Sequence, residues 1–218
     1  MILLLTALDR LAIRWHSDRN FRAFALATAA ATGMNLISPL GGPLNVIAPG
    51  STFGSIALLM GTALMAITFT ILINISLRAA RAAHLLQYGV GISALAWVAL
   101  VVCWAMGDSR RNSSWSLLRP ADPADAVFAA IYGIWLVIVA IMTIVGTTAA
   151  LRQIGPAARR GRRRMHAFRL SAVFGIAYGG LIVTNAAGLM GDLSNREITL
   201  VAEAVTAPAL VCFVAAVI

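Results

Sequence analysis

Long apolar segments alternate with short polar connections along this chain. Six segments reach the length of about 20 residues that a helix needs to cross a bilayer core. Unpaired backbone amides are too costly in lipid for other open structures, so each segment predicts a membrane-spanning helix. The predicted spans are residues 21–40, 53–77, 85–107, 127–151, 170–191 and 198–218. The expected fold class is therefore all-α, a polytopic transmembrane helix bundle with one membrane domain over 21–218.

Residues 1–20 allow two interpretations. Leu4, Leu8, Leu11 and Trp15 share one helical face, which is typical of an amphipathic helix on the cytoplasmic side of a membrane. Alternatively, this segment is the remnant of a truncated span, which would give seven spans in the complete gene. The last span also stops without the polar residues that usually follow a final helix, so a longer chain is expected at one end or both.

Composition agrees with a membrane location and excludes two classes of protein. The hydrophobic fraction is 60%, the charged fraction is 11% and the mean hydropathy is +0.87. A soluble domain carries about 25% charged residues, so a soluble enzyme and a disordered tail are both excluded. The 17 basic residues are all arginines, and with 8 acidic residues they give a formal net charge of +9.

The arginines also predict the orientation of the chain, because basic residues stay on the cytoplasmic side of a membrane. Thirteen fall on one side of the six-span arrangement, and only four fall on the other, together with five acidic residues. The four are Arg110, Arg111, Arg119 and Arg196. We therefore expect a multi-pass protein of the cytoplasmic membrane with both termini in the cytoplasm.

The densest basic run lies between the fourth and fifth predicted spans. Its central members are Arg159, Arg160, Arg162, Arg163 and Arg164. Arginine near an anionic leaflet gains about 1 kcal/mol of attraction, so these residues are candidates for contact with anionic lipid head groups. The simpler interpretation is that they only fix orientation and solvate a loop. Nucleic acid is not an expected partner, because no recognition fold accompanies the run.

One strong acid falls inside the predicted spans. Glu203 lies about six residues into the last span, and Asn185 and Asn35 lie at a similar depth, roughly 8–9 Å below the outer boundary. Thr184 and Thr206 extend this candidate outer-leaflet polar layer. Either Glu203 is protonated and its hydrogen bond to Asn185 joins two helices, or it belongs to a proton- or cation-coupled site.

Other motifs predict packing rather than chemistry. Gly175 and Gly179 are four residues apart, a spacing that allows close approach of two membrane helices. Asp122 and Asp125 suit either a divalent cation or, more simply, a helix start at which Asp125 is the cap. No zinc-protease, phosphate-loop or dinucleotide-binding motif occurs, so we predict no enzyme activity, no catalytic residue, no metal site and no cofactor.

Two stretches of the chain carry a resemblance to a known family. Arg22-Ala-Phe-Ala-Leu-Ala followed by Ile37-Ser-Pro39, and Phe174-Gly-Ile-Ala-Tyr-Gly179, are similar to segments of an actinobacterial polytopic membrane family labelled as transporters. The resemblance covers about 20–192. It implies a seven-helix membrane region, often with a cytosolic extension, and it implies no substrate or site residue.

These observations lead to three expectations for function. The first is a transporter-like or permease-like module in the lipid bilayer. The second is a membrane-embedded sensor or signalling domain that reports to a cytosolic partner. The third is a structural or assembly subunit, in which small-residue faces bind a membrane-protein partner or a second copy of the chain.

Overall fold

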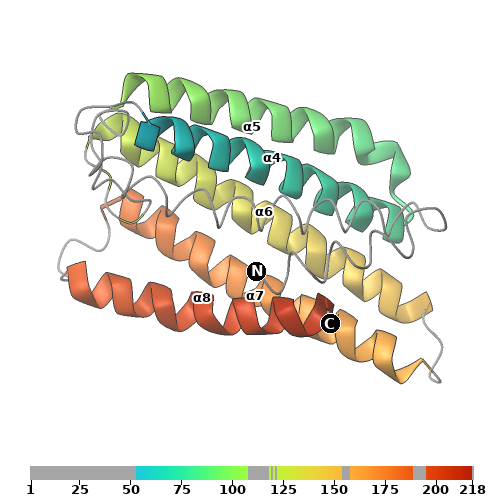
Figure 1. Ribbon diagram of the computed structural model, residues 1–218. Helices are drawn as coiled ribbons and strands as arrows, with labels where there is room; N and C mark the ends of the chain where they lie inside the picture. Colours follow the sequence, from blue (N-terminus) through green and yellow to red (C-terminus); the bar gives the residue numbers. More distant parts are fainter. Residues whose placement is uncertain are drawn as a thin grey trace.

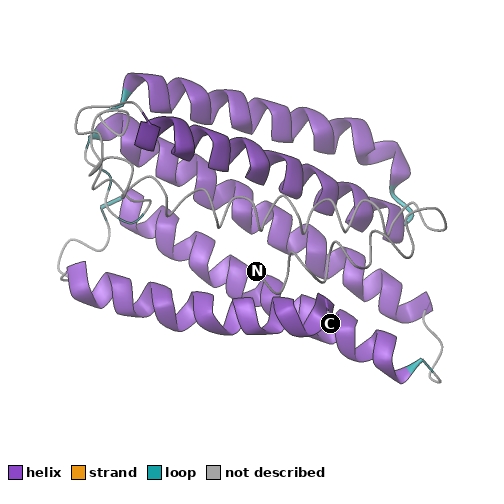
Figure 2. Cartoon of the chain, in the orientation of Figure 1, coloured by secondary structure: helices purple, strands orange, loops and turns teal. Residues whose placement is uncertain are grey.

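The computed structural model describes residues 53–107, 118, 120, 122–153, 158–188 and 195–217. Within these ranges the chain is entirely helical, with no strand (Figure 2). The helices are α4 (Phe53–Ala79), the short 3-10 helix η2 (Ala83–Leu85), α5 (Leu86–Met106), α6 (Pro123–Gln153), α7 (Arg159–Ala186) and α8 (Asn195–Val217). The all-α fold class is confirmed for this part of the chain. The predicted span 21–40 and the segment 1–20 lie outside the described residues.

The five long helices listed above lie side by side (Figure 1). α5 runs opposite to α4, α7 runs opposite to α6, and α8 runs opposite to α7. α6 occupies the middle of the arrangement, where it packs against α4, α5 and α7, while α8 packs chiefly against α7. Among the described residues, four helices are long and apolar enough to cross a membrane, over Thr62–Ala79, Leu86–Met106, Pro123–Gln153 and Arg159–Ala186. α8 has a shorter apolar stretch, Leu200–Ala209.

The outer surface of these helices is apolar. Residues such as Leu95 on α5 and Ile134 on α6 are 71% and 50% exposed. In water such a surface would aggregate, whereas lipid tails solvate it at no cost. The described helices therefore belong to a membrane-embedded protein.

A tight turn reverses the chain between α4 and α5. Ala82 donates its backbone N–H to Leu77 O at 2.8 Å, and Arg81 donates to Arg78 O at 3.0 Å. This is the pattern of a Schellman motif, in which the residue after the helix takes a left-handed conformation. Arg81 does so with φ of 59°, although glycine usually fills this position. At the same end of the bundle, Gln153 Nε2 donates to Ala79 O at 3.2 Å and joins the ends of α4 and α6.

One helix begins much earlier than the sequence predicts. The predicted span 170–191 corresponds to α7, which begins at Arg159 and ends at Ala186. The expectation that the basic run lies in a loop is therefore wrong, because the run falls within the first two turns of the helix. Arginine is a good helix former, and only Gly161 interrupts the run.

Candidate functional site

Three of the described members of the predicted outer polar layer have hydrogen-bond partners outside the layer. Asn185, near the end of α7, donates from Nδ2 to the carbonyl oxygen of Leu118 at 2.6 Å. Glu203 is exposed on α8, whereas Ile198 and Ala202 are buried among the side chains of that helix that the structure describes. No hydrogen bond joins Glu203 to Asn185 within the described part of the chain.

The two threonines of the layer are satisfied locally. Thr184 donates its hydroxyl to the carbonyl oxygen of Gly180 at 3.0 Å, and Thr206 donates to that of Ala202 at 2.8 Å. Such bonds to the preceding turn are the usual solution for hydroxyl side chains in membrane helices. Asn35 lies outside the described residues.

The two aspartates at the start of α6 take different roles from those expected. Asp122 Oδ1 accepts the backbone N–H of Asp125 at 2.8 Å, so Asp122 is the cap of the helix and Pro123 its first residue. The prediction that Asp125 is the cap is therefore wrong. Asp125 is fully buried and lies against Gly107, where a Cβ would come within 2.5 Å of Asp125 Oδ1. The described residues contain no group of three or more His, Cys, Asp or Glu that could hold a metal ion.

Among the described residues, hydroxyl side chains are buried at six positions on α4, α5 and α6. Each is less than 9% exposed. The hydroxyl members are Thr62, Thr68, Ser76, Ser93, Thr143 and Thr147. Three of them donate to a carbonyl oxygen one turn earlier in their own helix: Thr68 to Leu64, Thr143 to Val139 and Thr147 to Thr143. We call this set the interior hydroxyl seam.

Several buried donors on α5 and α6 have no acceptor in the described part of the chain. They are the hydroxyl of Ser93 and the indole N–H groups of Trp97, Trp104 and Trp135. Ser93, Trp97 and Trp104 recur at spacings of four and seven residues, which places them on one face of α5. A buried donor without an acceptor costs about 1–3 kcal/mol, so this face is suited to a molecule that accepts hydrogen bonds.

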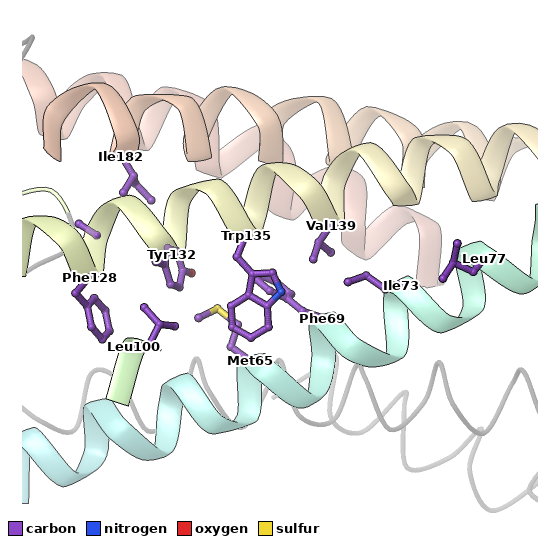
Figure 3. Packing of buried hydrophobic residues seen from close by; sticks show 11 residues of the cluster. Met65, Phe69, Ile73, Leu77, Leu100, Phe128, Tyr132, Trp135, Val139 and Ile182 are labelled. Carbon is purple, nitrogen blue, oxygen red and sulfur yellow. The ribbon is translucent and has the colours of Figure 1, made fainter. Parts of the chain in front are cut away.

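Trp135 lies at the centre of the apolar core beside the seam. Its indole points from α6 toward α4, next to Met65 and Phe69 (Figure 3). The Phe69 and Trp135 rings meet edge to face, with centroids 5.0 Å apart and an interplanar angle of 89°. Leu100 from α5 and Phe128 from α6 complete this region, so the seam is held by large, rigid side chains.

Glycines set the distances between the helices. A Cβ on Gly179 would lie 2.8 Å from the backbone oxygen of Gly133, and a Cβ on Gly133 would lie 2.8 Å from that of Gly179. α6 and α7 therefore touch through their backbones at this crossing. A Cβ on Gly175 would lie 3.5 Å from Ala140 Cβ, an ordinary contact distance. On the other side of α6, a Cβ on Gly146 would lie 2.5 Å from Ser76 Cα.

Sequence reasoning missed most of this arrangement. It named Gly179 but neither Gly133 nor Gly146. The available signal was the presence of Gly133 and Gly146 in the middle of an otherwise bulky apolar span.

Most arginines of the described chain lie at one end of the bundle. Nine arginines of the described chain lie at the end where α4 and α6 finish and α7 begins: Arg78, Arg81, Arg152, Arg159, Arg160, Arg162, Arg163, Arg164 and Arg169. Asp122, Asp125 and Glu197 lie at the opposite end. We call the first group the basic end. Comparisons with protein-family models, curated proteins and solved structures returned no match for this chain.

Proposed function

We propose that this chain is a transporter-like or permease-like module of the cytoplasmic membrane, with six spans, both termini in the cytoplasm and the basic end on the cytoplasmic side. We also propose that the chain is related to the actinobacterial family labelled as transporters, which two of its segments resemble. It places the route for a small polar solute along the interior hydroxyl seam rather than at Glu203.

The observation that carries the proposal is the unsatisfied donor face of α5. Helix packing alone would favour apolar or self-bonded side chains at these positions, as Thr143 and Thr147 illustrate. Ser93 is only 2% exposed, yet its hydroxyl has no acceptor in the described chain. A solute with carbonyl, carboxylate or hydroxyl oxygens would supply the acceptors that this face lacks.

Transport assays on the full chain in proteoliposomes test this function. The solutes are a panel of inorganic cations, amino acids and sugars, followed as uptake of the labelled compound. For a solute that is taken up, Ser93→Ala should lower the rate by about tenfold, because one hydrogen bond to the solute is lost. Glu203→Gln is the control and should leave the rate unchanged.

Three outcomes contradict parts of this proposal. Uptake that survives Ser93→Ala but not Glu203→Gln would return the site to the outer layer and support a coupled carboxylate. Equal uptake by both variants and the original chain would remove the seam from the route. No uptake of any solute, with correctly inserted protein, would favour the sensor or the assembly subunit.

The orientation is tested separately by labelling of single cysteines in intact cells, in a chain whose Cys103 and Cys212 are changed to alanine. A cysteine at Arg159 should resist a membrane-impermeant maleimide, because the basic end faces the cytoplasm. A cysteine at Pro120 should react, because it precedes α6 at the opposite end of the bundle. The reverse pattern would invert the proposed topology.

A further inference from the structure

One exposed face of α7 changes from basic to apolar along its length. Arg159, Arg163 and His166 are exposed in the first turns, and Leu170, Val173 and Ala177 are exposed in the turns that follow. The intervals are four, three, four, three and four residues, so the six side chains form one stripe on the helix surface. Leu170 and Val173 are 48% and 50% exposed.

The same order recurs on α6. Val127, Ile134, Ile138, Ile141 and Val145 are exposed at helical spacing, and the exposed Arg152 follows seven residues later on the same face. Two helices thus end an apolar stripe with arginine at the basic end. This is the order of groups in a phospholipid, which has a charged phosphate at one end and apolar chains beside it.

We infer that the stripe of α7 binds an anionic phospholipid lengthwise, with its phosphate at Arg159 and Arg163 and an acyl chain along Leu170, Val173 and Ala177. This inference rests on the proposed placement of the bundle in a membrane. It also narrows the predicted set of five lipid-contacting arginines to Arg159 and Arg163, the two that lie on the exposed stripe.

The electrostatics of α7 support an anionic occupant. The first turn of the helix contains no acidic residue, and the amino-terminal end of a helix is the positive end of its dipole. Arg159 and Arg163 are four residues apart, where two like charges repel and destabilise a helix. A lipid phosphate at this position offsets both effects.

Lipid binding is measured on the full chain in a neutral detergent. The probes are phosphatidylglycerol and phosphatidylcholine labelled on an acyl chain, and the readout is fluorescence anisotropy. Phosphatidylglycerol should bind more tightly than phosphatidylcholine. The Arg159→Gln/Arg163→Gln variant should lose about 25-fold in affinity for phosphatidylglycerol, at roughly fivefold per arginine.

The matched control is Arg110→Gln/Arg111→Gln, which removes the same charge from the connection between α5 and α6 and should bind like the original chain. Equal affinity for the two lipids, or an unchanged affinity in the Arg159→Gln/Arg163→Gln variant, would overturn the inference. Competition by inorganic phosphate alone would indicate a free-anion site. Binding of a DNA duplex that these substitutions abolish would indicate nucleic acid instead.

Lipid binding can also be tested on the original chain, so that the result does not depend on whether a variant folds. In nanodiscs, amide hydrogen exchange of the first two turns of α7 should be slower with phosphatidylglycerol than with phosphatidylcholine alone, and identical rates would contradict the inference. Carbonate extraction of membranes distinguishes a failure of the lipid site from a failure of the proposed membrane placement. Protein released by carbonate would contradict membrane placement itself, whereas retained protein with equal affinity for both lipids would contradict only the lipid site.

Discussion

Replacing Gly179 by alanine is expected to destabilise the bundle by about 1–3 kcal/mol, because the added methyl group overpacks the α6–α7 crossing. The nearest obstacle is the backbone oxygen of Gly133, at 2.8 Å from the new Cβ, and backbone cannot rotate away as a side chain can. Unfolding in mixed micelles, induced by SDS and followed by far-ultraviolet circular dichroism, measures the change in free energy.

The next residue provides the matched control. A Cβ on Gly180 would meet nothing within 4 Å, so Gly180→Ala should be neutral or should stabilise the helix by up to about 1 kcal/mol. Gly133→Ala should reproduce the loss seen for Gly179→Ala, since the contact is reciprocal. If the Gly179 and Gly180 variants have equal stability, the close crossing of α6 and α7 is not present in the protein.

Trp135→Ala should cost about 3–5 kcal/mol of unfolding free energy, the largest loss that we expect from one substitution. Trp135 is 2% exposed and meets Phe69 edge to face, so its removal leaves a cavity where α6 packs on α4. Lipid tails are as apolar as the core, and the loss therefore comes from missing packing contacts rather than from exposure to water.

Two further variants locate the cause of that loss. Trp135→Phe keeps most of the ring contact and should cost clearly less than Trp135→Ala. Ile134→Ala removes a side chain that is 50% exposed to the surroundings of the bundle, and should cost less than about 1 kcal/mol. Similar losses for Ile134→Ala and Trp135→Ala would mean that the two side chains do not differ in burial as described.

The helical class and most helix positions could be predicted because lipid imposes a simple rule. A chain that crosses a bilayer must pair its backbone within each segment, so an apolar run of sufficient length becomes a helix. Hence the predicted span 85–107 corresponds closely to α5, Leu86–Met106. The start of α7 was misplaced because hydropathy reports where a helix enters lipid, whereas Arg159–Arg169 is helical outside the apolar stretch.

The candidate site could not be predicted in the same way. Counting residues gives the depth of Glu203 and Asn185, but not the direction in which either side chain points. Glu203 lies on an exposed face of α8, and Asn185 bonds to Leu118 O, although both stand at similar depth. A similar depth along two helices therefore does not predict a hydrogen bond between Glu203 and Asn185.

The sequence by itself determined that this protein is helical, largely apolar and strongly basic in particular segments between its apolar runs. Only the tertiary structure decided which faces are interior: Ser93, Trp135, Gly133 and Gly146 inward, Leu95 and Ile134 outward. The physical reason is that both the lipid and the core are apolar. In a soluble helix, the difference between a polar face and an apolar face shows which face is buried. That difference is absent here, so the close packing of side chains determines which face lies inside.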